Sequence, residues 1–174
     1  MASSPARRWW AEKIGRAIRS VHATVSSAER ADVARVLGPV EVALFETMPR
    51  ADQRHGLDVA VALRRAGYGA DRDLIAAGLL HDAGKGPSVR LWHRVAWSLG
   101  ERYGRGIVGT LAWLPGARAV FDRLDRHPQL SAELARGAGA AARTVELIAA
   151  QADPADAAAR ALRAADEGEL EAGG

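Results

Sequence analysis

The chain has 174 residues, enough for one domain with a sizeable core. It contains no cysteine, which excludes a disulfide framework, a thiolate metal site and a cysteine nucleophile. Apolar residues make up 48% and charged residues 26% of the chain, the balance of a folded globular protein. The formal net charge of +3 is carried almost wholly by arginine, since Lys13 and Lys85 are the only lysines. A charge this small does not indicate specific nucleic-acid binding.

The beginning of the sequence lacks the pattern of a secretory signal, because no unbroken apolar stretch follows the basic residues. The most apolar window, residues 107–121, contains Arg118 and is shorter than the ~20 residues that a membrane-spanning helix needs. We therefore expect a cytoplasmic protein.

Helical spacing of apolar residues runs through most of the chain, and the alternation typical of strands is absent. Alanine is abundant, and glycines and prolines separate roughly eight to ten helical segments. The sequence predicts an all-α fold: a compact multi-helix bundle over residues 26–168. Residues 169–174 are predicted to form a short, disordered acidic tail.

Residues 1–25 are predicted to form a separate basic amphipathic helix. Trp10, Ile14 and Ile18 fall on one face, and arginines cover much of the rest. Such a helix can dock on its own domain, or it can make weak contact with an anionic membrane surface. The pattern leaves both alternatives open.

Four further helices matter for the site. One is expected to start after Ser27, and one over residues 53–66 is largely apolar and has His55 near its start. A third, over residues 71–83, begins with acidic residues and ends at Gly84, and the fourth is the alanine-rich segment 154–165.

The sharpest feature is the segment from Leu79 to Gly86. An apolar helix ends in His81 and Asp82, and Gly84 then allows the chain to leave the helix. At a helix end both side chains can reach one cation held beyond the terminus, where the carbonyl groups also favour positive charge. Taken alone, the pair could equally cap the helix and hydrogen-bond to each other.

This segment resembles the central motif of the HD-domain superfamily of metal-dependent phosphohydrolases, which reads His-Asp-hydrophobic-Gly-Lys. That superfamily is all-α and binds its metal through a histidine, the His-Asp pair and a distant aspartate. Over residues 45–166 the resemblance implies the ligands His55, His81, Asp82 and Asp166. Asp153 is the alternative to Asp166, which could instead belong to a solvated acidic tail.

The implied ligand set mixes imidazoles with carboxylates. It suits Mn, Fe, Co, Ni or Zn better than Mg or Ca, which prefer all-oxygen sites. His127 resembles a further histidine of the superfamily members that hold extra metal, but Gln151 and Ala152 stand where another histidine is expected. We therefore expect one divalent transition metal ion and at best a weak second.

Four residues are candidates for contact with an anionic substrate. Lys85 follows the His-Asp pair and is expected to contact phosphate, with Asp82 and Lys85 as the catalytic pair. Arg90 and His93 share one helical face, which could face the substrate or be a solvated basic surface. His127 is either a site residue near the phosphate or an ordinary residue at a helix start.

The function implied by the resemblance is hydrolysis of a nucleotide or another small phosphate ester by water that the metal activates. The alternative is a catalytically weak or inactive module of the same type, used for ligand sensing or as a scaffold. The sequence indicates neither the substrate nor the oligomeric state.

Overall fold

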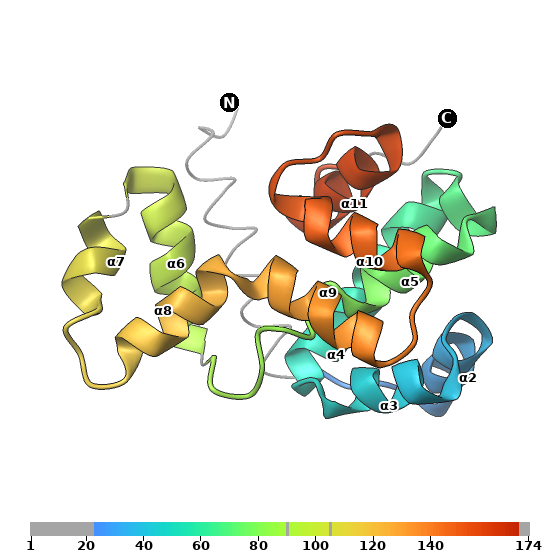
Figure 1. The fold of residues 1–174 in the computed structure, drawn as a ribbon, viewed down its shortest axis with the longest axis horizontal. Helices are drawn as coiled ribbons and strands as arrows, with labels where there is room; N and C mark the ends of the chain where they lie inside the picture. The colour runs from blue at the N-terminus through green and yellow to red at the C-terminus, as the bar shows by residue number, and fades with distance from the viewer. Residues whose placement is uncertain (1–22, 90, 105, 171–174) are drawn as a thin grey trace, which may run out of the picture.

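The computed structural model describes residues 23–89, 91–104 and 106–170, and all regular elements in these residues are helices, which confirms the predicted all-α class (Figure 1). None of the helices described is long and apolar enough to cross a bilayer. The α-helices are α2 (Ser27–Val36), α3 (Pro39–Thr47), α4 (Arg50–Arg65), α5 (Arg72–Leu80), α6 (Leu91–Tyr103), α7 (Gly106–Leu111), α8 (Ala117–Asp125), α9 (His127–Gly137), α10 (Ala142–Ala149) and α11 (Ala157–Glu167). Two short 3₁₀-helices are η1 (Tyr68–Ala70) and η2 (Ala150–Ala152).

Polar side chains set the starts of three helices. Ser26 caps α2 by accepting a hydrogen bond from the backbone N–H of Glu29, so this helix includes Ser27 and begins one residue earlier than predicted. Asp71 caps α5, and Asp156 caps α11, in the same way. Each cap satisfies a backbone donor that the helix itself leaves without a partner.

The other helix ends correct several predicted boundaries. The helix of His55 begins at Arg50, three residues before the predicted start, and α5 ends at Leu80, so His81 and Asp82 lie in the turn that follows. The final helix begins at Ala157 and not at residue 154. The predicted tail does not begin at residue 169, because the N–H groups of the two residues after Gly168 donate to the carbonyl of Ala164. Residues 171–174 and the main part of the predicted helix 1–25 lie outside the described residues.

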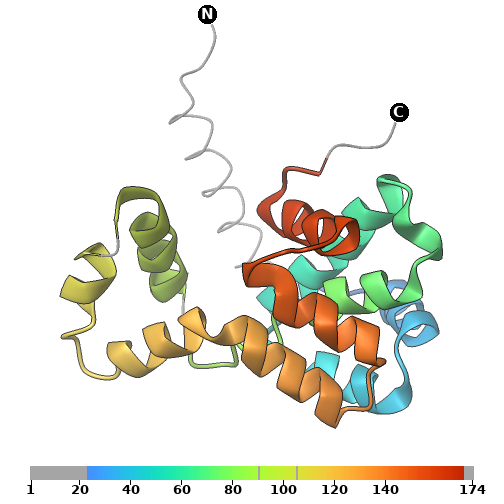
Figure 2. The same cartoon turned by 45° about the horizontal axis from the view of Figure 1, so that its top comes forward.

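The main hydrophobic core surrounds α5. Its residues 74–80 are all buried, because α4, α10 and α11 pack around it (Figures 1 and 2). Large side chains from four helices fill this core: Leu63, Leu74, Leu80, Ile148 and Leu162. A helix that is apolar on all sides belongs in such a position, since no face of it favours water.

Helices α6, α7 and α8 stand to one side of this core in both views, and we call them the satellite module (Figures 1 and 2). They enclose a second, smaller cluster with Val89, Ala96, Phe121 and Leu124. The bundle predicted over residues 26–168 therefore contains two hydrophobic clusters.

Two glycines allow backbone segments to approach closely beside the predicted site. A Cβ atom on Gly56 would lie 2.8 Å from the carbonyl oxygen of Leu79, so only glycine permits α4 to pack this tightly on α5 next to His55. A Cβ atom on Gly84 would lie 2.6 Å from the carbonyl oxygen of His127 and 2.6 Å from the nitrogen of Ser131. These approaches fix α4, and the turn after α5, against their neighbours.

Candidate metal centre

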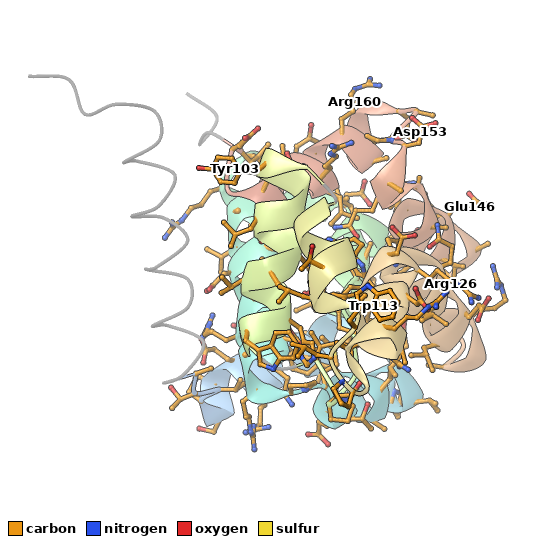
Figure 3. The ribbon with its side chains drawn as sticks, turned by 90° about the vertical axis from the view of Figure 1, so that its left-hand side faces the viewer. Tyr103, Trp113, Arg126, Glu146, Asp153 and Arg160 are labelled. Atoms are coloured by element: carbon orange, nitrogen blue, oxygen red, sulfur yellow. The ribbon has the colours of Figure 1, made fainter. Side chains whose placement is uncertain are left out.

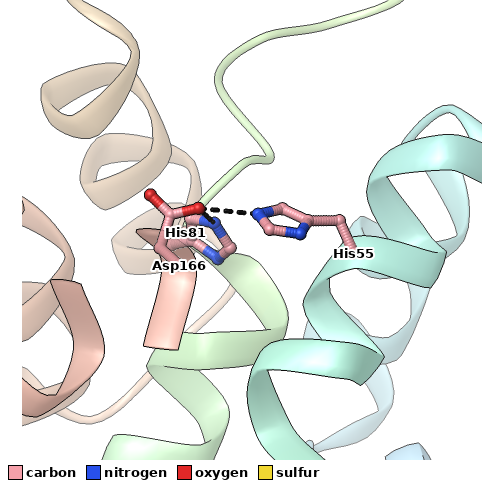
Figure 4. Close-up of side chains that lie close together, drawn as sticks. All are labelled: His55, His81 and Asp166. Carbon is pink, nitrogen blue, oxygen red and sulfur yellow. Dashed lines mark hydrogen bonds and ion pairs between the residues drawn. The ribbon is translucent and has the colours of Figure 1, made fainter. Parts of the chain in front are cut away.

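Three side chains that are far apart in the sequence converge at one point (Figure 4). His55 comes from α4, His81 from the C-terminal cap of α5, and Asp166 from near the end of α11. The Nε2 atoms of His55 and His81 lie 2.6 Å and 3.5 Å from Oδ1 of Asp166. One ligand atom from each residue lies within 4.8 Å of the other two. This group, which contains three of the four predicted ligands, could hold a metal ion.

The ring of His81 is oriented for ligation. Its Nδ1 lies 2.9 Å from the carbonyl oxygen of Gly78, which can only accept a hydrogen bond, so Nδ1 carries the proton of the neutral ring. Nε2 then presents a lone pair and has no hydrogen-bond partner among the described residues. It lies 3.4 Å from Oδ1 of Asp82 and 3.5 Å from Oδ1 of Asp166. When the ring is neutral, three acceptor atoms therefore face one another in a buried space, and either a proton on Nε2 or a metal ion between them would stabilise the group.

Opposite charges within this group stabilise one another and shift the pKa values of His81 and the two carboxyls. Burial alone would lower the pKa of His81, but the carboxylates of Asp82 and Asp166 outweigh burial and raise it to about 9. Burial alone would raise the pKa values of both carboxyls, but the neighbouring cationic groups hold them well below the ordinary range. In the metal-free protein a proton on His81 balances this negative charge, and a divalent ion would take the place of that proton.

Asp82 borders the three-residue group and pairs with Lys85. Its carboxylate is 1% exposed, and Lys85 Nζ lies 2.7 Å from each of its two oxygens. Oδ1 is buried and has no hydrogen bond of good geometry within the described part of the chain. The structure places both residues beside His81, while their catalytic roles and the role of Asp82 as fourth ligand stay predictions.

His127 lies on the other side of Asp82, at the start of α9. Its Nδ1 is 2.6 Å from the carbonyl oxygen of Leu124, and its Nε2 is 3.8 Å from Oδ1 of Asp82. Burial, with the nearby charge of Lys85, lowers the pKa of His127, so the ring is neutral at pH 7. Its predicted contact with substrate is not tested by these distances, but its place beside Asp82 fits that prediction.

Gln151 has a role that the sequence did not reveal. It stands where another histidine was expected, and its Nε2 donates a hydrogen bond to Oδ2 of Asp166 over 3.0 Å. The Oε1 atom of the same amide is buried without a hydrogen-bond partner in the described chain. Gln151 thus orients Asp166 so that Oδ1 faces the two histidines.

Two further residues missed by the sequence analysis hold the turn after α5. The backbone N–H of Gly84 donates to Oγ of Ser131, 2.8 Å away, and Nε of Arg123 donates to the carbonyl oxygens of Gly84 and Lys85 at 2.7 and 2.9 Å. No local pattern could have identified them, because they act from 38 to 47 residues away in the sequence.

The remaining candidates lie elsewhere. Asp153, the alternative to Asp166, is exposed at the surface (Figure 3). His93 is 5% exposed in the satellite module, where its ring stacks on Trp92 with a centroid distance of 3.7 Å and packs edge-on against Phe121. Its predicted contact with substrate stays a prediction. Arg90 lies outside the described residues.

Comparisons with protein-family models, with curated proteins and with solved structures gave no match for this chain. The interpretation of the site therefore depends on its own geometry and on the motif residues.

Proposed function

We propose that this protein is a metal-dependent phosphohydrolase of the HD type, acting on a nucleotide or another small phosphate ester. The observation that carries the proposal is the buried Nε2 atom of His81, which faces two carboxylates with His55 beside it and which a bound metal ion could reach once its proton is displaced. The side chains of His55 and Asp166 are 24% and 28% exposed, whereas those of His81 and Asp82 are fully buried. The group is thus open to solvent on one side, where a substrate could reach it.

His55, His81 and Asp166 would hold the ion, and Asp82 is the proposed fourth ligand. When bound, a divalent Mn, Fe, Co, Ni or Zn ion would acidify water and polarise a phosphoryl oxygen. The ammonium group of Lys85 lies beside Asp82, where it can neutralise negative charge that develops on the phosphoryl group. His127 is held by Leu124 with Nε2 as the acceptor, so it can accept a hydrogen bond from the attacking water or from the substrate.

A second candidate function is a sensing or scaffold module that binds a ligand without hydrolysing it. The observation in its favour is the close pairing of Lys85 with both oxygens of Asp82, since an ammonium group in that position competes with a metal ion for the carboxylate. Gln151, in the place of a histidine, agrees with this alternative.

One experiment separates the two functions. The purified full-length chain would be analysed for bound transition metal and assayed with Mn or Co against p-nitrophenyl phosphate and a panel of nucleotides. We expect metal binding and hydrolysis in the wild type, and a loss of both by more than about 100-fold in His81→Ala and Asp166→Ala. Asp153→Ala is the matched control, because it removes an exposed carboxylate outside the site.

Each result has a definite meaning. If the protein binds metal but hydrolyses no compound in the panel, the result contradicts the phosphohydrolase proposal and supports the sensing module. A wild-type protein that binds no transition metal contradicts the phosphohydrolase proposal and favours the sensing or scaffold module, in which Lys85 occupies the Asp82 carboxylate.

A further inference from the structure

The satellite module exposes an unusual amount of apolar surface. Trp113 is 92% exposed and Leu114 is 48% exposed, in the turn between α7 and α8. Five of the eight large apolar side chains that are exposed in the described chain belong to this module: Trp92, Val95, Tyr103, Trp113 and Leu114. Figure 3 looks onto this end of the molecule and shows Trp113 on its outer surface. Single exposed apolar residues are common, but the adjacent Trp113 and Leu114 together expose a large apolar area, which indicates a binding surface.

The turn itself is well ordered by hydrogen bonds. The N–H of Leu114 donates to the carbonyl of Leu111, and the N–H of Ala117 donates to the carbonyl of Leu114. Gly116 has a φ of +77°, a left-handed conformation that glycine adopts without strain and that returns the chain into α8. The buried Ala117 on the inner side packs into the satellite cluster. The fold therefore presents Trp113 and Leu114 to the outside in a fixed position.

The same part of the sequence is one of two basic segments of the chain. Residues 90–118 contain five arginines and one glutamate, a net charge of +4, whereas the whole chain carries +3. Residues 1–25 also carry a net charge of +4, and all other residues together carry −5. Among these arginines, Arg118 is exposed, directly after the turn. A segment with this excess of positive charge complements an anionic partner.

We propose that the satellite module docks reversibly on an anionic lipid surface, with Trp113 and Leu114 entering the interface. Indole rings favour the boundary between headgroups and acyl chains, and arginine is attracted to anionic headgroups. A protein partner would need a pocket that encloses a nearly bare indole ring, whereas a bilayer accepts it without one. A second copy of this chain fits less well, because it would bring the same positive excess into the contact.

The test uses the full-length protein and co-sedimentation with vesicles. We expect binding to vesicles of phosphatidylcholine mixed with phosphatidylglycerol, weaker binding with added salt, and little binding to phosphatidylcholine alone. The double variant Trp113→Ala/Leu114→Ala should reduce partitioning about tenfold. The matched control Val40→Ala/Leu134→Ala removes exposed apolar side chains from α3 and α9 and should bind as the wild type does.

Three vesicle results would overturn the proposal. They are equal binding to neutral vesicles, unchanged binding of the Trp113/Leu114 variant, and a loss of binding in Trp9→Ala/Trp10→Ala only. The proposal would also be overturned if the wild-type protein were a dimer that does not bind vesicles and the Trp113/Leu114 variant were a monomer. That result would show that a second copy of the chain covers the turn. A chelator should leave vesicle binding unchanged, so the outcome is independent of the proposed phosphohydrolase function.

Discussion

The two oxygens of the Asp166 carboxylate have different partners. Oδ1 faces His55 and His81, and Oδ2 accepts a hydrogen bond from Gln151. Because the amide holds one oxygen, the other keeps the direction that a metal ion requires. Partners of this kind, which touch the ligand and not the ion, commonly determine metal affinity.

Replacing Gln151 with methionine tests this arrangement. The side chain keeps its length but loses the donor to Asp166, so we expect metal affinity to fall about 10- to 100-fold. The free energy of unfolding should change by no more than about 1 kcal/mol, because removal of the unpartnered Oε1 offsets the loss of the hydrogen bond to Asp166. Isothermal titration with Co or Mn and urea denaturation measure the two effects. Gln129→Met, at an exposed position of α9, is the control, and equal affinities in both variants would refute the role of Gln151.

The protonation of His81 gives a second prediction at this scale. Its pKa in the folded, metal-free protein is about 9, above the ordinary value of 6.5, so folding favours the protonated ring. Its contribution to stability is fully present below about pH 6.5 and is lost as the pH rises through about 9. Metal affinity should rise over the same range, because the ion displaces that proton.

Thermal unfolding of the chelator-treated protein measures the first effect, and titration with metal in buffers of different protonation enthalpy measures the proton release. A histidine NMR titration that placed His81 near 6.5 in the metal-free protein would contradict the prediction.

At the scale of elements, side chains of α8 and α9 hold the turn between α5 and α6 in place. Ser131 on α9 and Arg123 on α8 bind its backbone, and Gly84 lies directly against the start of α9. The turn carries Asp82 and Lys85, so the packing of α8 and α9 determines where these side chains lie.

Gly84→Ala should separate the turn from α9. The added methyl group would meet two backbone atoms at 2.6 Å, which cannot move independently of their helix. We expect a loss of about 1–3 kcal/mol in the free energy of unfolding, together with weaker metal binding. In Gly137→Ala the methyl group meets nothing within 4 Å, and this helix position should gain up to about 1 kcal/mol. Urea denaturation and metal titration compare the variants, and equal effects would refute the packing argument.

The all-α class was predictable from the sequence, because local apolar spacing and glycine breaks indicate the helices. The caps Asp71 and Asp156, which set the starts of α5 and α11, were not predicted. His55, His81 and Asp166 were identified through the motif, and the structure brings them together. The roles of Gln151 and Arg123 were not predictable, since they depend on tertiary contacts between distant segments. The satellite module was missed for a related reason: its helices have ordinary amphipathic patterns, and only packing shows which cluster they join.

The described part of the molecule has two hydrophobic clusters, and the helices that carry the candidate metal site all pack in the larger one. The smaller cluster has five buried residues in the described chain, and Phe121 and Leu124 are the two with large side chains. We therefore expect the satellite module to open more readily than the main core.

Phe121→Ala and Leu162→Ala test this difference. Phe121→Ala should lower the free energy of unfolding by about 3–5 kcal/mol. It should accelerate amide hydrogen exchange in α6 and α7 and change metal affinity little. Leu162→Ala should lower the free energy of unfolding by about 2–5 kcal/mol and so lower the melting temperature of the main core. It should also weaken metal binding, because α11 carries Asp166. A single transition shifted equally by both variants, with equal effects on exchange throughout, would show that the clusters unfold together.

The distance along the chain between the residues of the candidate metal site has a consequence for biosynthesis. His55 and Asp166 are separated by 111 residues, and α11 leaves the ribosome after all the other described helices. An ion therefore cannot act as a nucleus for the early stages of folding, since closing so long a loop requires that most of the topology is already in place. Metal loading would then report that the chain has reached its native topology, and polypeptides interrupted before α11 would remain unloaded.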